Sequence, residues 1–462
     1  MDKYKKLVSN AIIFTVGSFS SKILSVLLLR LYTSCMTEDQ FSTTSLIQTV
    51  VNLLEPLASL SMAEAVVRYG VEKSVKKNNL YSSVFAVALL GIIASMCLFP
   101  LISLYPDFKP YISYMMIFLF TSAFRWINQQ QAKVKNYSKL FAIDGILSVL
   151  TLTLFMLIFL VGFKLTIRGY LLSLILSDLC SILFLFYFAD IYRDLSPRYV
   201  DRKLIKKMIA YSLPLIPTKL LWWVVGSSDG FMVAGWVGKS ENGIYQAAYK
   251  IPNLISAVST MFFYAWQMSA IAEYNSDERK KFYTKVFDAY IAIMFVGSAG
   301  IMFLLKPLTK LITDERFHNA YRFSPFLIIA VLFMSFSMFL SSIYNATNNN
   351  KKSLTSSMWA AGINLGLNVL MILWFDAQGA AFATMIAYFV CFMIRIVETQ
   401  QMARYSVSWR RLGTDLVILL FMAIVLIADF PVMYLWLFIG LTAMIAVNYG
   451  PFELTVRKVL KR

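Results

Sequence analysis

The sequence predicts an all-α polytopic membrane protein with about 14 transmembrane helices, in two six-helix lobes followed by two C-terminal helices. First, 59% of the 462 residues are hydrophobic and the mean hydropathy is +0.66, which is more apolar surface than a soluble core of this size buries. Second, apolar runs close to the ~20 residues that span a bilayer recur along the whole chain. The alternating segments of about 10 residues that build membrane barrels are absent from the sequence, so the spans are helices.

Apolar runs and the polar breaks between them place the individual spans. They cover residues 8–31, 41–66, 80–104, 111–132, 140–163, 167–189, 206–237, 244–271, 282–305, 323–347, 353–375, 378–400, 412–430 and 432–450. With both chain ends inside, and with each charge within five residues of a span end counted with the adjoining connection, the cytoplasmic tails and connections hold 30 Lys and Arg residues and the opposite side nine. Because cytoplasmic loops carry the excess of basic residues, we expect both termini to be cytoplasmic.

Two basic polar breaks predict the domain organisation. Six spans precede the connection 190–207, and six more precede the break at Arg404. We therefore predict an N-terminal lobe at 1–190, a cytoplasmic linker at 191–205, a C-terminal lobe at 206–403, and two helices with a cytoplasmic tail at 404–462. The halves are weakly similar, as in "VNLLEPLAS" from Val51 and "PNLISAVST" from Pro252. Such repeats are typical of transporters that bind substrate at the repeat interface.

Composition argues against several other classes of function. The net charge of +18 comes from basic residues scattered through short loops, so we interpret them as topology signals and expect no nucleic-acid partner. The four cysteines show no metal-binding spacing, and we expect neither a metal nor a cofactor. His318 is the one histidine, and no Walker, HExxH or GxSxG motif occurs. We therefore expect no catalytic residues and no enzymatic activity.

Charged residues inside the predicted spans are the candidate site residues. Each costs several kcal/mol against lipid and should face protein or a water-filled cavity. Four are cations in both halves of the chain, which favours an electropositive central cavity for an anionic passenger: Lys22, Arg125, Lys219 and Lys250. The acidic residues Glu55, Asp178 and Asp229 are candidate coupling groups or salt-bridge partners. A structural salt bridge explains any single one of these charges about as well as a ligand contact.

Arg125 is the strongest candidate for direct substrate contact. Its guanidinium presents a planar fork of donors that can hold two phosphate oxygens at once, whereas lysine offers a mobile point charge. It lies in "FRWINQQQ", and the glutamines fit either a neighbouring sugar or polar helix packing.

Two prolines predict a bend in the seventh span, 206–237. Pro214 and Pro217 each remove a backbone donor and clash with the preceding turn, so the helix should bend near its first third. We expect a conformational hinge there, although a fixed kink accounts for the prolines equally well.

Several strings in the sequence resemble one family. These include "YSLPLIP" from Tyr211, "SSD" ending at Asp229, "GIYQAAYKIP" from Gly243, "FYAWQ" from Phe263 and "GSFSSKILSVLLLRLY" from Gly17. Together they resemble the polysaccharide transporter family, the O-antigen or capsule repeat-unit flippases of the multidrug/oligosaccharidyl-lipid/polysaccharide exporter superfamily. One departure concerns Gly230, because many relatives carry an arginine after the aspartate, and this puts the partner of Asp229 in doubt.

The resemblance implies two lobes that rock to alternate access. It implies a polyprenyl-pyrophosphate-linked oligosaccharide as passenger, as in lipopolysaccharide O-antigen synthesis, moved across the bacterial inner membrane. Membrane lipids and other polysaccharide assembly proteins are the expected partners. Two alternatives stay open: a cation-coupled multidrug exporter of the same fold, and a membrane glycan polymerase, against which the short external connections argue.

Overall fold

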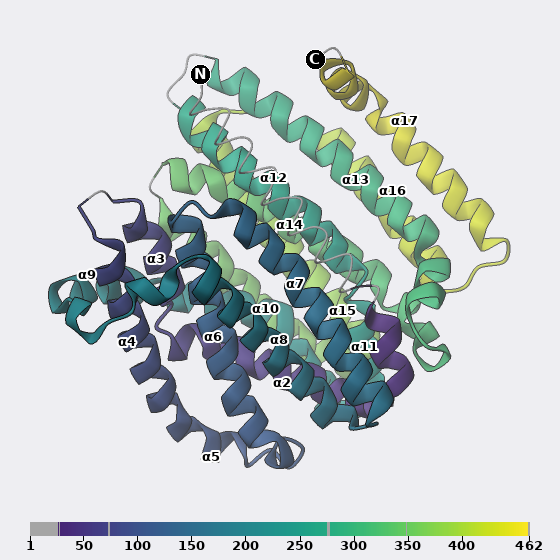
Figure 1. Ribbon diagram of the computed structural model, residues 1–462. Helices are drawn as coiled ribbons and strands as arrows, with labels where there is room; N and C mark the ends of the chain where they lie inside the picture. The colour runs from purple at the N-terminus through teal and green to yellow at the C-terminus, as the bar shows by residue number, and fades with distance from the viewer. Residues whose placement is uncertain (1–25, 27, 73, 275–277, 348, 461–462) are drawn as a thin grey trace. The chain divides into compact units, whose positions relative to one another are not determined.

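The structure is a computed structural model that describes residues 26, 28–72, 74–274, 278–347 and 349–460. Within these ranges every regular element is helical and there is no strand, which confirms the all-α prediction (Figure 1). The chain divides into two compact units, unit 1 (Met1–Trp223) and unit 2 (Val224–Arg462). This division falls inside a helix, downstream of the predicted linker at 191–205.

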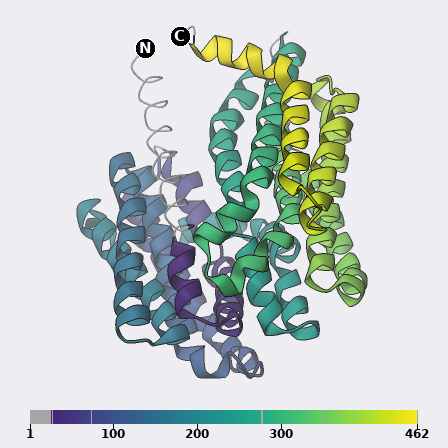
Figure 2. The same cartoon turned by 90° about the vertical axis from the view of Figure 1, so that its right-hand side faces the viewer.

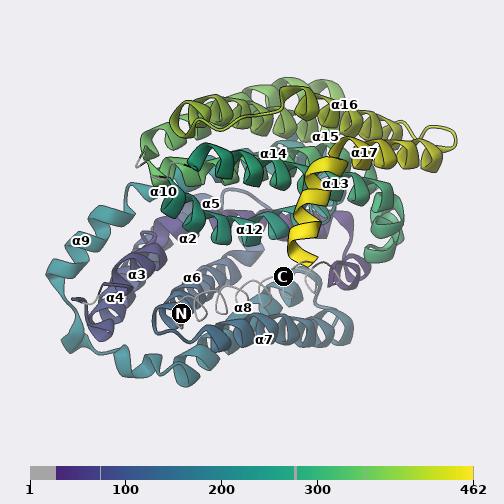
Figure 3. The ribbon, with the colours of Figure 1, turned by 90° about the horizontal axis from the view of Figure 1, so that it is seen from above.

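Unit 1 is a bundle centred on α8. Its α-helices are α2 (Glu38–Ala58), α3 (Met62–Gly70), α4 (Lys77–Ser95), α5 (Phe99–Ile102), α6 (Ile112–Val134), α7 (Ser138–Met156), α8 (Thr166–Phe188), α9 (Arg202–Ser212) and the first part of α10 (Leu215–Trp236). Short turns are η1 (Met96–Leu98), η2 (Lys109–Tyr111), the π-helical η3 (Leu157–Gly162), η4 (Ile191–Asp194) and η5 (Pro197–Tyr199). Helix α8 packs against both α6 and α7 (Figure 3).

The predicted span 41–66 is a broken helix. Thr37 caps the start of α2 with a complete capping box, and α2 and α3 meet at an angle of 51°. Leu60 and Ser61 at the break have positive φ angles of 49° and 51°, a conformation that few non-glycine residues adopt. The sequence did not predict this break, because the backbone geometry of Leu60 and Ser61 depends on tertiary packing.

The connection between α8 and α9 is bound to unit 1. Ser82 Oγ donates to the carbonyl of Asp194 at 2.6 Å and accepts from the amide of Ser196 at 3.0 Å. Lys135 forms an ion pair with the Asp194 carboxylate at 3.0 Å, and Ser83 Oγ accepts from the amide of Asp201. The predicted linker is therefore a docked segment whose backbone groups are satisfied by unit 1.

Unit 2 is built around α14. It holds the rest of α10 together with α11 (Lys239–Ala248), α12 (Pro252–Glu273), α13 (Arg279–Ile312), η6 (Glu315–Arg322), α14 (Ser324–Ala346), α15 (Asn350–Ala403), α16 (Trp409–Ile427) and α17 (Met433–Leu460). Helix α14 lies between α12 and α15 (Figure 3), and 78% of its most apolar stretch is buried. Trp266 of α12 stacks on Phe339 of α14 at 4.6 Å between ring centroids. Helix α17 packs against α13 and α16, and its C-terminal end turns away from the direction of the rest of the helix (Figure 2).

The helices match the predicted spans closely from 41–66 onward. Among the described residues, eight helices are long and apolar enough to cross a membrane, and α2 with α3 would form a ninth. The spans 353–375 and 378–400 are the two arms of α15, which is kinked at Phe375 and Asp376. Most of the first span, 8–31, lies outside the described residues. The chain is thus a multi-pass membrane protein.

Candidate functional site

An ion pair joins α6 and α8 inside unit 1. Nη1 of Arg125 donates to Oδ1 of Asp178 at 2.6 Å, and the hydroxyl of Thr121 donates to Oδ2 at 3.5 Å. The Asp178 side chain is 6% exposed, whereas that of Arg125 is 28% exposed. Among the described residues Asp178 is the one carboxylate in ion-pair contact with Arg125. The remaining guanidinium donors are therefore free for a further acceptor.

A second buried carboxylate continues this polar network. Asp144 of α7 accepts hydrogen bonds from Ser181 at 2.5 Å and from Gln129 at 2.8 Å. The Asp144 side chain is inaccessible to solvent, and Arg125 is close enough to interact with its charge. One glutamine of the "NQQQ" run thus has a packing role, as the alternative interpretation of that run held.

Lys219 is paired in unit 1 with an acid that the sequence analysis missed. Its Nζ lies 2.6 Å from Oε1 of Glu64, which belongs to α3. The other oxygen of Glu64 is buried and has no hydrogen-bond partner among the described residues. Glu55 accepts from Ser59 at 3.2 Å and lies within electrostatic range of both Lys219 and Glu64. Two glutamates therefore share one lysine.

In unit 2, Asp229 is fully buried and held by neutral donors. The hydroxyls of Tyr245 and Tyr249 each donate to Oδ2 at 2.6 Å, and the amide of Gly230 donates to Oδ1 at 2.8 Å. Thr384 Oγ1 lies 3.4 Å from Oδ2. Tyr245 and Tyr249 reach one carboxylate because residues four apart share a helix face. Their spacing in "GIYQAAYKIP" was the signal that could have identified them.

Amide side chains extend the Asp229 network into α15. Asn364 donates to Thr384 at 3.1 Å and accepts from Asn368 at 3.1 Å, and Ser228 donates to Asn364 at 3.3 Å. The carbonyl oxygen of the Asn368 side chain is buried without a partner among the described residues. A buried carboxylate beside oxygen-bearing side chains and an orphan acceptor has the chemistry to take up a proton or a small cation.

The glycine that follows Asp229 lies against the side chain of Gln246. A Cβ at position 230 would lie 2.4 Å from the side-chain nitrogen of Gln246. Gln246 in turn donates to Asn242 at 3.3 Å. The space beside Gly230 is therefore occupied by Gln246, and the two tyrosines donate hydrogen bonds to Asp229.

Where the structure describes them, the remaining predicted site residues do not belong to the networks above. Lys22 lies outside the described residues. Lys250 follows α11 in unit 2, is partly exposed, and makes no hydrogen bond or ion pair through its ammonium group with the described residues. The helix is interrupted at Leu213 and Pro214, and Pro217 lies in the first turn of α10. Arg125 and Lys219 belong to unit 1 and Lys250 to unit 2, so one shared cavity for the four cations stays a prediction.

Comparison with protein families gives two matches. A model described as polysaccharide biosynthesis protein matches residues 7–267, which is more than half of the chain. A model described as MatE matches residues 214–370. No curated protein matches the chain in sequence.

Several solved structures share the fold. A multidrug resistance MATE family transporter of the MOP superfamily, in an inward-facing conformation, aligns with a TM-score of 0.70 and 16% identity over 86% of this chain and 100% of its own. The lipid II flippase MurJ, in an inward closed conformation, aligns with a TM-score of 0.70 and 15% identity over 97% of this chain and 100% of its own. A MOP superfamily transporter from Pyrococcus furiosus aligns with a TM-score of 0.64 and 16% identity over 86% and 96%.

Proposed function

Because this chain belongs to the polysaccharide biosynthesis protein family, we propose that it is a flippase for a polyprenyl-pyrophosphate-linked oligosaccharide repeat unit. It moves this molecule across the bacterial inner membrane by alternating access, with the O-antigen of lipopolysaccharide or a capsule as the final product. The family match over residues 7–267 carries the proposal, and a fold shared with a lipid II flippase supports it. The chain acts as a transporter and not as a glycan polymerase, with other polysaccharide assembly proteins as partners.

Arg125 supports an anionic passenger. One of its nitrogens is fixed by Asp178, and its side chain keeps 28% of its surface exposed. An anchored guanidinium of this kind is pre-organised to bind a second anion, such as a pyrophosphate, with its other donors. In this proposal Lys22 and Lys250 add positive charge along the path of the passenger, whereas the charge of Lys219 is neutralised by its ion pair with Glu64.

Asp229 is the proposed coupling group. Its carboxylate is fully buried, and its hydrogen-bond donors are neutral hydroxyls and one backbone amide. A buried charge without a counter-charge is costly, so uptake of a proton or sodium ion would stabilise one conformation over another. Asp229→Asn should therefore remove the dependence of transport on pH or sodium while the protein still folds.

The test is a flipping assay in vesicles. Purified protein is reconstituted with a fluorescent polyprenyl-pyrophosphate carrying N-acetylglucosamine, and a membrane-impermeant reagent measures the fraction that reaches the opposite leaflet. We expect faster flipping than in protein-free vesicles and than with an Arg125→Lys variant at equal protein content. Flipping no faster than in protein-free vesicles would contradict the proposal.

The second candidate function is a cation-coupled multidrug exporter. The match of residues 214–370 to the MatE model favours it, and so does the buried Asp229 carboxylate. The same vesicles loaded with a cationic dye separate the two candidates. Dye efflux driven by a sodium or proton gradient, without movement of the lipid-linked sugar, would favour the exporter.

A further inference from the structure

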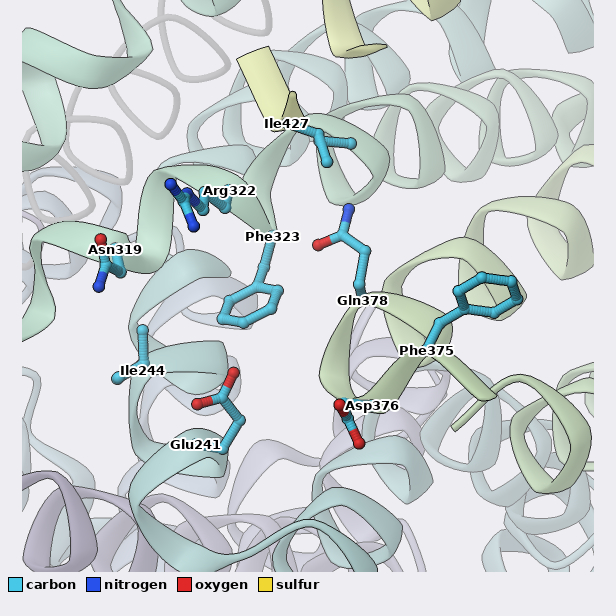
Figure 4. Close-up of a pocket in the computed structure, with 9 residues that line it drawn as sticks. All are labelled: Glu241, Ile244, Asn319, Arg322, Phe323, Phe375, Asp376, Gln378 and Ile427. Carbon is cyan, nitrogen blue, oxygen red and sulfur yellow. The ribbon is translucent and has the colours of Figure 1, made fainter. Parts of the chain in front are cut away.

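Unit 2 contains a cavity of about 340 Å³ that no step of the proposed transport uses (Figure 4). Four segments far apart in sequence line it: α11, η6, the kink of α15 and the end of α16. Its polar lining residues are Glu241, Asn319, Arg322, Asp376 and Gln378. The volume is at the lower end of the range for small-molecule sites.

Two carboxylates occupy opposite sides of this pocket. Glu241 projects from α11 and Asp376 from the kink of α15, and they face one another in Figure 4. Among the described residues neither forms an ion pair. Burial and the charge of Asp376 raise the pKa of Glu241. Asp376 is held with a φ of 50°, a strained value for a non-glycine residue, so the kink fixes the second carboxylate at the pocket.

The pocket also presents a buried donor and an aromatic ring. Nε2 of Gln378 is buried and has no hydrogen-bond partner among the described residues. In Figure 4 the ring of Phe323 lies between Glu241 and Gln378. An unpaired buried amide is costly, and a ligand that accepts its hydrogen bond removes that cost.

These groups together match the surface of a sugar. Sugar hydroxyls donate to carboxylates and accept from amides, while the C–H face of the ring packs on an aromatic side chain. A single small cation would satisfy the carboxylates but would leave the Gln378 donor unpaired. The combination therefore favours a hydroxyl-rich neutral or amino sugar.

The lining segments share one side of the predicted topology. The connections that hold Glu241, Arg322, Asp376 and the end of α16 all follow odd-numbered spans, which the count of basic residues places outside the cytoplasm. We propose that this pocket is an external subsite that binds one sugar residue of the glycan as it leaves the protein. This role rests on the proposed flippase function.

Binding of soluble sugars to the purified protein tests the subsite directly. The probes are the methyl glycosides of N-acetylglucosamine, galactose, rhamnose and glucuronic acid, detected by saturation-transfer NMR. We expect at least one of the three neutral glycosides to bind the wild-type protein, and Glu241→Gln/Asp376→Asn and Gln378→Leu each to weaken this binding about tenfold. Glu315→Gln removes an exposed acid of η6 outside the pocket lining and should leave binding unchanged.

Three results would overturn the subsite. The first is that no probe binds the wild-type protein. The second is that the probe binds the pocket variants as strongly as the wild-type protein, while these variants retain the thermal unfolding transition. The third is that calcium or sodium alone stabilises the wild-type protein against thermal unfolding and does not stabilise the pocket variants. The vesicle assay keeps this test separate from the proposed function. If the wild-type chain flips the lipid-linked sugar but binds no soluble sugar, only the subsite proposal is wrong. If it binds sugar but does not flip, the flippase proposal is wrong, and so is the role of the pocket in release.

Discussion

At the scale of single residues, Arg125 is the position where charge and geometry are both needed. A lysine there keeps the positive charge and can still pair with Asp178, but it loses the planar fork of donors. We expect Arg125→Lys to fold normally and to weaken substrate binding by about 1.5 to 3 kcal/mol, roughly ten- to hundredfold. Concentration dependence of flipping in vesicles measures this loss.

The matched control for Arg125 is Arg193→Lys. Arg193 lies in η4, and its side chain is 68% exposed. Replacing this guanidinium with the ammonium group of lysine should therefore not change transport. Arg125→Ala is a poorer test because it leaves the Asp178 carboxylate buried and unpaired, which destabilises the fold. Native transport by Arg125→Lys would show that substrate binding does not need the planar fork of the guanidinium.

Glu241 gives a prediction about stability and pH. Burial and the charge of Asp376 raise its pKa, while Arg322 is the basic residue of the same lining. Ionised Glu241 therefore lowers the free energy of unfolding. This loss of stability is absent below the pKa of 4.5 that the group has in the unfolded chain, and it grows as the pH rises through the higher pKa of the folded protein. Glu241→Gln should raise the Tm slightly at about pH 7.5 and leave it unchanged near pH 4. A lower Tm at the higher pH would contradict this sign.

At the scale of elements, the break between α9 and α10 is the feature with a functional prediction. A helix that ran unbroken from α9 into α10 would need backbone N–H groups at positions 214 and 217 to donate to the carbonyls of Ala210 and Leu213, and proline supplies neither. Both prolines lie in unit 1, where the ion pair of Lys219 with Glu64 and the hydrogen bond from Trp223 to the Thr49 carbonyl at 2.9 Å hold the start of α10. We expect Pro214→Ala/Pro217→Ala to lengthen the helix, raise thermal stability and slow flipping, because a stiffer helix hinders the exchange between conformations.

Pro325→Ala is the control for these prolines. Pro325 lies in the first turn of α14, where a proline removes no helix hydrogen bond, so its replacement should change neither property. Native flipping by the double variant would show that the bend is a fixed kink.

The elements also show what could be predicted from sequence. Long apolar runs located the spans because lipid imposes helices on any segment of that length and composition. Breaks inside spans depend on packing, and the left-handed Leu60 and Ser61 carry no local signal. At the site, membrane-depth charges were identifiable as costly, but Glu64 was not assigned to Lys219 because 155 residues separate them. Thr384 was not assigned to Asp229 because the two residues are also far apart in the sequence. Tyr245 and Tyr249 could have been identified, because residues four apart lie on the same face of a helix.

At the scale of the whole molecule, orientation decides which way a passenger moves and whether the Glu241 pocket lies on the release side. The excess of 30 over nine basic residues predicts a cytoplasmic connection at 190–207 and cytoplasmic termini. The structure separates this connection from η6 by three helical passages, namely α9 with α10, α11 with α12, and α13. Because these passages correspond to the predicted spans 206–237, 244–271 and 282–305, we expect the two segments to lie on opposite sides of the membrane.

Two cysteine substitutions test this orientation with matched chemistry. Arg198 and Arg316 are both exposed, in η5 and η6 respectively, and each can be replaced singly by cysteine after Cys35, Cys97, Cys180 and Cys391 are changed to serine or alanine. We expect an impermeant maleimide to label Arg316→Cys in intact spheroplasts and Arg198→Cys only after permeabilisation. Transport by the cysteine-free parent shows that the background is native. Labelling of both positions from outside would contradict the three crossings, and the reverse pattern would invert the topology, placing the Glu241 pocket on the side where substrate is loaded.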